Sequence, residues 1–128
     1  MRQTMKDCTI YKMTDLVGKK WTLCILHELY KGNMCGKRFN ELKDHLEDIT
    51  PKTLSARLKE LEKEGMITKT VDSSSFPVKC EYSLTKKGEE LIEVIQMLKN
   101  WGNKWMVNNA LCRRTLCIEC KKDQNSQI

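Results

Sequence analysis

Residues 50–65 constrain the fold most, because they specify where a helix begins, where it ends and which of its faces is buried. Thr50 can accept a hydrogen bond from a first-turn amide, and Pro51 suits the first helical position, where no backbone donor is needed. Three leucines recur at helical spacing and predict a buried stripe: Leu54, Leu58 and Leu61. Gly65 can end the helix, so the sequence predicts an amphipathic helix over 51–64.

The rest of the chain predicts four more helices and a hairpin. Apolar residues at helical spacing place the helices over 11–17, 20–30, 38–46 and 86–108. Segments rich in Thr, Val and Ile predict strands over 66–71 and 78–84. The fold class is mainly α with a small β-hairpin wing, the plan of a winged helix-turn-helix. We assign this domain to 1–109 of the 128 residues, and we predict no further element in the basic, cysteine-containing tail 110–128.

The outward face of the helix over 51–64 has the chemistry of a major-groove reader. At 100° per residue, the face opposite the leucines carries Lys52, Ala56, Lys59 and Lys63, flanked by Thr53 and Ser55, and these are small polar and basic groups that can enter a major groove. The hairpin beside it carries Lys69 and Lys79, which suit phosphate or minor-groove contact. A solvated helix face and a plain surface hairpin remain the alternatives. Acidic residues in the C-terminal half of the helix place any DNA contact in its N-terminal half.

The predicted helix over 86–108 has a wider apolar surface than packing on one small body requires. We infer that a second subunit covers part of it, with three interface candidates: Leu98, Trp101 and Trp105. The net charge of +6 permits nucleic acid as a partner without requiring it. Residues 51–79, which contain the presumed DNA-contacting helix and hairpin, hold six basic and four acidic residues, whereas 99–122 hold six basic residues and one acidic residue. Because the positive charge is not concentrated on the presumed DNA surface, the order of elements is the stronger argument for DNA binding.

Five segments, in order, resemble the HxlR-type winged helix-turn-helix regulators, which belong to the MarR-like superfamily. They are 16–26 (LVGKKWTLCIL), 38–42 (RFNEL), 50–61 (TPKTLSARLKEL), 81–88 (EYSLTKKG) and 101–102 (WG). The resemblance covers about residues 8–105, although the segment 32–37 is longer than the family's and the tail extends past its pattern.

The resemblance implies a homodimeric transcriptional regulator that binds double-stranded DNA at a partly palindromic operator. The recognition helix then corresponds to 51–64 and the wing to 72–78. Two further DNA-contact candidates, Arg38 and Asn40, lie in the matching segment 38–42. A two-fold dimer would set two recognition helices in successive major grooves.

Seven cysteines in a chain whose start lacks an apolar signal segment indicate reduced thiols, metal ligands or a redox sensor rather than a disulfide scaffold, and they favour a cytoplasmic location. The resemblance implies that Cys8 can be a redox switch, and we hypothesise a disulfide between Cys8 of one subunit and Cys112 of the other. Cys24 is expected in the core and Cys80 in a structural position on its strand. His27 and His45 are expected to be surface or hydrogen-bonded histidines.

The spacing of Cys112, Cys117 and Cys120 leaves three alternatives: inert thiols, redox sensing, or a zinc or iron–sulfur site. We expect no cofactor, with metal as the alternative. A thiol oxidoreductase using Cys117 and Cys120 is disfavoured because no βαβ pattern accompanies them, and no P-loop, HExxH or Ser-His-Asp arrangement occurs. We therefore predict a regulator rather than an enzyme, with no membrane partner. A winged-helix module for protein contacts in transcription or replication, or a metal-binding regulator, is the alternative.

Overall fold

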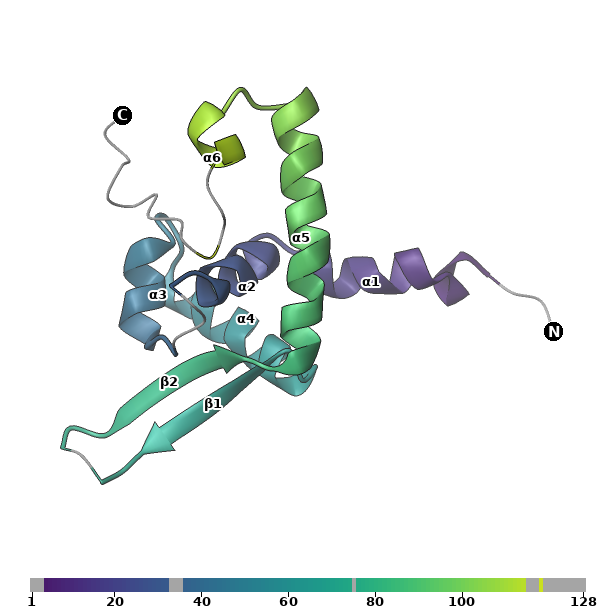
Figure 1. The fold of residues 1–128 in the computed structure, drawn as a ribbon. Helices are drawn as coiled ribbons and strands as arrows, with labels where there is room; N and C mark the ends of the chain where they lie inside the picture. The colour runs from purple at the N-terminus through teal and green to yellow at the C-terminus, as the bar shows by residue number, and fades with distance from the viewer. Residues whose placement is uncertain (1–3, 33–35, 75, 115–117, 119–128) are drawn as a thin grey trace.

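A computed structural model of the chain describes residues 4–32, 36–74, 76–114 and 118, and it consists of helices and one hairpin (Figure 1). A 3-10 turn η1 (Met5–Asp7) precedes the elements, which follow in this order: α1 (Thr9–Val17), α2 (Thr22–Tyr30), α3 (Phe39–His45), α4 (Pro51–Lys63), β1 (Ile67–Asp72), β2 (Lys79–Leu84), α5 (Lys86–Trp105) and α6 (Ala110–Arg114). The predicted fold class, mainly α with a small hairpin, is confirmed.

Helix α4 begins as its sequence predicts. Thr50 is the N-cap, and its Oγ1 accepts a hydrogen bond from the amide of Thr53 at 3.1 Å, with Pro51 in the first turn. The three leucines of the stripe are buried. The helix ends at Lys63, one residue earlier than predicted, and Gly65 follows in the left-handed region with φ of 76°.

Other predicted boundaries were wrong by one to three residues. Helix α2 starts at Thr22 rather than at residue 20, because Trp21 has a φ of 83°, which no helix can include. Helix α5 ends at Trp105 rather than at residue 108. The tail is not devoid of structure, because α6 covers Ala110–Arg114 and packs on α5.

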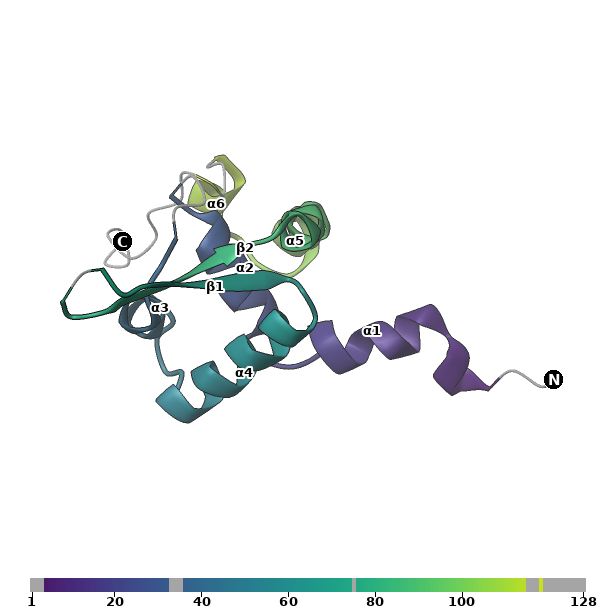
Figure 2. The ribbon, with the colours of Figure 1, turned by 90° about the horizontal axis from the view of Figure 1, so that it is seen from below.

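The strands pair antiparallel, from Ile67 with Leu84 at the base to Asp72 with Lys79 at the tip. Lys37 extends the pairing on the other side of β2, because its amide donates to the carbonyl of Tyr82 at 3.0 Å and its carbonyl accepts from the Tyr82 amide at 2.7 Å. The hairpin is therefore held at its base by the segment before α3, while its tip projects from the body (Figures 1 and 2).

The core lies where α2, α3, α4, the base of the hairpin and α5 meet. Its buried residues are Ile25, Leu26, Leu29, Leu42, Leu46, Ile49, Leu54, Leu58, Leu61, Met66, Ile67, Tyr82, Ile92 and Ile95. Helix α1 contributes none of them and extends away from the body (Figure 1). Cys24, expected in the core, is exposed instead, because α2 turns this position away from its buried stripe. In the described ranges, no helix is long and apolar enough to cross a membrane.

Candidate nucleic-acid interface

The face of α4 that points away from the core carries the predicted reading groups. Lys52, Ala56, Lys59 and Lys63 are exposed, and Thr53 and Ser55 are half-buried at the flanks. Thr53 also belongs to the helix cap, because its hydroxyl accepts a hydrogen bond from the Thr50 hydroxyl at 3.0 Å. The structure thus brings the predicted α4 residues to one surface and leaves them accessible.

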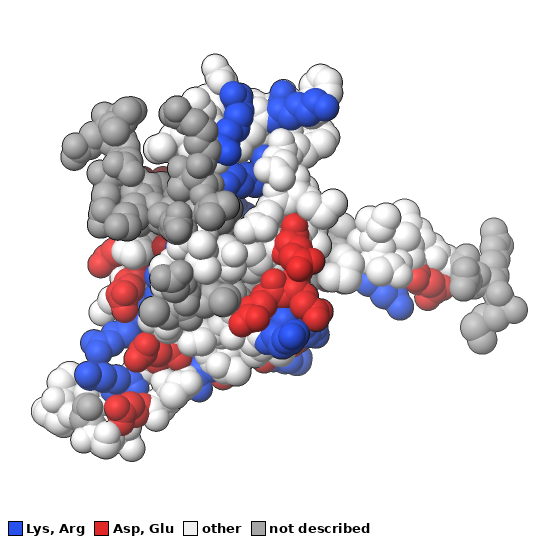
Figure 3. Space-filling model, viewed as in Figure 1, with Lys and Arg blue, Asp and Glu red and all other residues white. Residues whose placement is uncertain are grey.

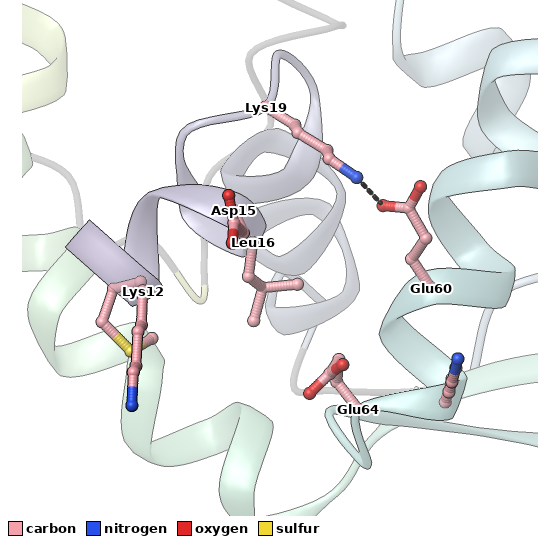
Figure 4. Close-up of a pocket in the computed structure, with 8 residues that line it drawn as sticks. Lys12, Asp15, Leu16, Lys19, Glu60 and Glu64 are labelled. Carbon is pink, nitrogen blue, oxygen red and sulfur yellow. Dashed lines mark hydrogen bonds and ion pairs between the residues drawn. The ribbon is translucent and has the colours of Figure 1, made fainter. Parts of the chain in front are cut away.

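The acidic residues of α4 lie in its C-terminal half. Glu60 binds Lys19 at 3.1 Å and Arg57 at 2.9 Å, which ties its carboxylate to the turn between α1 and α2 (Figure 4). Next to this ion pair lies a hollow of about 460 Å³ between α1 and α4, with Lys12, Asp15, Leu16 and Glu64 among its lining residues (Figure 4). The N-terminal half of α4 is therefore the more basic part of its outward face.

Helix α3 presents Arg38 and Asn40 at its start. Both are exposed, and the Arg38 amide donates to the Glu41 carboxylate at 3.2 Å, which fixes the first turn. Arg38 directly follows Lys37, whose backbone pairs with β2, so the start of α3 is attached to the wing.

The wing presents Lys69 and Lys79, both exposed, from its two strands. The Lys69 ammonium lies 6.0 Å from the centre of the Tyr82 ring. Burial raises the pKa of Tyr82, which outweighs the opposing effect of Lys69. In Figure 2 the hairpin runs out on the same side as the N-terminal end of α4, so these lysines and the α4 face can approach one ligand.

A buried ionic cluster joins α2 to α3 behind this surface. Glu28 is 4% exposed and binds Lys31 at 3.1 Å and His45 Nδ1 at 3.0 Å. Burial raises the pKa of the Glu28 carboxyl, but Lys31 and His45 together lower it more, so the net pKa is below the usual value. The Lys37 ammonium donates to the carbonyls of Glu28 at 2.7 Å and Lys31 at 3.0 Å, and so caps the end of α2. Sequence reasoning expected a hydrogen-bonded or surface histidine at 45 but missed this cluster.

The predicted interface residues of α5 lie on an exposed apolar face. Leu98, Trp101 and Trp105 are 50%, 56% and 68% exposed. The same helix and its continuation expose further apolar side chains: Val94, Met97, Met106, Val107 and Leu111. Helix α1 adds Ile10 and Met13.

The four described cysteines are free thiols. Cys8 is exposed and is the N-cap residue of α1, whereas Cys112 is half-buried in α6 and its sulfur accepts from Asn103 Nδ2 at 3.4 Å. Cys80 is half-buried against the core, as expected of a structural position. Cys117 and Cys120 lie outside the described residues, so the metal hypothesis stays a prediction. Within the described ranges, no group of three potential metal ligands occurs.

A mainly helical body, a capped helix with a basic outward face and a basic hairpin beside it define a winged helix-turn-helix DNA-binding protein. Residues 16–110 match the HxlR-like helix-turn-helix family, and the chain belongs to this family. It is 36% identical over 95 residues to the HTH-type transcriptional regulator YvaP of Bacillus subtilis, covering 74% of this chain and 84% of that one. It is 42% identical over 102 residues to an HTH-type transcriptional regulator of Halalkalibacterium halodurans, covering 80% and 88%.

Solved structures that are similar to this chain are also transcriptional regulators. The reduced form of the transcriptional regulator YodB from Bacillus subtilis superposes with a TM-score of 0.67 at 33% identity, covering 80% of this chain and 97% of that one. The oxidized form of the redox regulator HypR gives 0.67 at 32% identity, covering 76% and 96%. A MarR-family regulator from Porphyromonas gingivalis gives 0.72 at 28% identity, covering 83% and 100%. The predicted winged helix-turn-helix is confirmed, and the chain is a DNA-binding transcriptional regulator rather than an enzyme.

Proposed function

We propose that the chain acts as a homodimer on a partly palindromic operator, with α4 in the major groove and the hairpin beside it. The observation that carries this proposal is the division of α4 into a buried leucine stripe and an exposed face of Lys52, Ala56 and Lys59. Lys can hold phosphate or guanine, and an Ala methyl can contact a thymine methyl. As a member of a family of DNA-binding transcriptional regulators, the protein is expected to act in the cytoplasm.

The remaining DNA-contact candidates lie on α3, on the wing and at the flanks of the α4 face. Arg38 and Asn40 at the start of α3, and Lys69 and Lys79 on the wing, are exposed and suit phosphate contacts on either side of α4. Thr53 and Ser55, half-buried at the flanks of the α4 face, suit contacts to base edges.

The exposed apolar face of α5 supports the homodimer. Trp101 and Trp105 are more than half exposed although they carry the two largest apolar side chains of the helix, and contiguous apolar surface of this kind marks interaction sites. A second copy of α5 presents the same face and fits a two-fold interface. Two-fold symmetry also gives each α4 an equivalent half-site one helical turn away.

Substitutions on α4 test the groove assignment. Lys52→Ala and Lys59→Ala are each expected to weaken operator binding and to lower the slope of log affinity against log salt by about 1, because each removes a phosphate neutraliser. Lys63→Ala is the matched control and is expected to keep the wild-type affinity and salt slope. Lys63 is exposed on the same helix, but it lies at the C-terminal end, beyond the half of α4 assigned to DNA, and lines the hollow toward α1. Fluorescence anisotropy over a salt series measures all three. Equal, unchanged affinity for Lys52→Ala and Lys59→Ala would contradict the assignment.

We further propose that the regulator responds to thiol oxidation through Cys8 and Cys112. Support comes from the exposure of Cys8, from the position of Cys112 on α6, which packs on the proposed dimer helix, and from the similarity to the redox regulator HypR. In a disulfide between two subunits, two thiols lose two protons and two electrons to an oxidant such as diamide. After diamide treatment, non-reducing electrophoresis is expected to show a covalent dimer that is absent from Cys8→Ser and Cys112→Ser but present in the control Cys24→Ser. A monomer band for the oxidised wild type rejects the proposal.

A further inference from the structure

The wing ends in an apolar tip that the contacts proposed above do not use. Phe76 is 99% exposed, Pro77 is exposed and Val78 is 55% exposed. We call these three residues the wing tip. A Phe side chain normally buries a large apolar area, so an almost fully exposed one at the end of a projecting hairpin indicates a binding role.

Cationic side chains lie directly behind the wing tip. Lys79 follows Val78 in the chain, and Lys69 lies further back on the opposite strand. Asp72 is the acidic residue at this end, and its carboxylate is occupied locally, because it accepts hydrogen bonds from the amide and hydroxyl of Ser74. These contacts brace the turn. Basic groups gather near this end of the hairpin in Figure 3, while acidic groups gather over the N-terminal half of α5.

The size of the wing tip decides which partner it fits. A stable protein interface buries about 800 Å² on each partner, and three side chains at a hairpin end supply a fraction of that. An apolar wedge in the DNA minor groove needs one or two side chains, and Phe and Pro are among the residues that act in this way. The lysines behind the tip add the charge that phosphates flanking the groove require.

We propose that Phe76, supported by Pro77 and Val78, inserts from the minor groove against a base step beside the sequence contacted by α4, and so bends the DNA. This inference rests on the proposed placement of α4 and the wing on DNA. A wedge partly unstacks one step, and pyrimidine–purine steps unstack most readily. The wing tip therefore adds a preference for a flexible step at a position that no polar side chain reads.

The test uses a duplex that the wild-type protein selects from a randomised library, labelled at both ends for fluorescence energy transfer. Wild type is expected to bend this duplex by tens of degrees. Phe76→Ala is expected to lose most of the bend and about tenfold in affinity, with an unchanged salt slope. Phe76→Leu, which keeps an apolar wedge, is expected to retain most of the bend.

Lys79→Ala is the matched control on the same hairpin. It is expected to lower the salt slope by about 1 while keeping the bend, because it removes charge and not the wedge. Because Phe76 is exposed, Phe76→Ala is expected to keep the thermal midpoint of the wild type.

Three outcomes overturn the inference: an unbent duplex with wild type, a bend unchanged by Phe76→Ala, or a Phe76→Ala protein with an altered sedimentation mass. The last would assign the tip to a contact between copies. A library from which wild type selects no sequence would instead defeat the proposed operator binding, and unchanged affinity for Lys52→Ala and Lys59→Ala would defeat the groove assignment. The two failures are thus distinguishable.

Discussion

Glu28 is the residue on which the attachment of α3 to α2 depends. Its carboxylate is 4% exposed and satisfies both the buried Lys31 ammonium and His45. Glu28→Gln leaves Lys31 buried without its counter-charge, so we expect a loss of about 3 kcal/mol in the free energy of unfolding. Urea denaturation measures it, with exposed Glu47→Gln as the control, expected to change stability by less than about 0.5 kcal/mol. Equal stability of the two variants would show that the cluster contributes nothing.

The same carboxylate makes stability depend on pH. Its pKa is lower in the folded chain than in the unfolded chain, so its contribution is fully present above the unfolded value of about 4.3 and is lost as the pH falls through the folded value. We expect the urea midpoint of wild type to fall as the pH drops below the unfolded value and through the lowered folded pKa of Glu28, and that of Glu28→Gln to fall less. Parallel pH profiles for the two proteins would exclude Glu28 as a source of the acid sensitivity.

For single residues, the sequence predicts burial and contacts well when these depend on neighbours in the same helix or strand. The leucines of α4 and the exposed lysines opposite them follow from helical periodicity. Glu28 and His45 are 17 positions apart, and their contact depends on how α2 and α3 pack. Cys24 lies beside buried Ile25 in sequence, and its exposure follows from the rotation of α2 about its axis, which periodicity in a nine-residue helix fixes poorly.

The junction of α4 and α5 joins the proposed recognition helix to the proposed dimer helix. The Lys87 ammonium donates to the Glu64 carbonyl at 2.7 Å, and the Thr85 amide donates to the Met66 carbonyl at 3.0 Å. Gly88 packs on this junction so closely that an added Cβ would overlap the Met66 carbonyl oxygen. These contacts hold the start of α5 against the end of α4.

Gly88→Ala tests this close approach. The Cβ overlap outweighs the helix propensity gained from Ala, so we expect a net loss of about 1–3 kcal/mol in the free energy of unfolding. Thermal and urea unfolding followed by circular dichroism measure it. Glu90→Ala, an exposed substitution in the same turn of α5, is the control and is expected to stay within about 0.5 kcal/mol of wild type. A stabilised Gly88→Ala protein would contradict the packing at this junction.

Elements are predictable where local signals begin and end them. The cap at Thr50 and the glycine at 65 fix α4 to within one residue. Helix α6 also has a local start signal, because Asn109 Oδ1 accepts a hydrogen bond from the Cys112 amide at 3.0 Å, but a single Asn does not by itself predict a five-residue helix. Contacts with α5 hold it as well, including the Arg113 guanidinium, which donates to the Asn103 carbonyl at 3.1 Å. Helix α2 is shorter than predicted because Trp21 has a positive φ, a conformation that a tryptophan rarely adopts and that its sequence does not predict.

The distribution of charge over the whole molecule suits one orientation on DNA. Helices α4 and α5 lie on opposite sides of the hairpin (Figure 2). The N-terminal half of α5 carries exposed Glu89, Glu90 and Glu93, and acidic groups gather over this half of the helix in Figure 3. Phosphates are repelled from these acidic groups and attracted to the lysines of α4 and the wing. The net charge of the chain conceals this separation, because it sums the acids of α5 with the lysines of α4 and the wing.

The exposed apolar face of α5 gives a prediction about the association of two subunits. Trp101→Glu places a charge on the proposed interface, and loss of a buried aromatic contact of this kind costs at least about 2 kcal/mol, so we expect the dimer dissociation constant to rise about 30-fold or more. Sedimentation equilibrium measures it, and circular dichroism checks that the protomer stays folded. Val71→Glu is the matched control, because Val71 is 57% exposed against 56% for Trp101 but lies on the wing. If both variants keep the mass of the wild type, the subunits do not associate through α5. If Trp101→Glu alone dissociates, its affinity for a full operator should fall to that for a single half-site, since each α4 then binds without its partner.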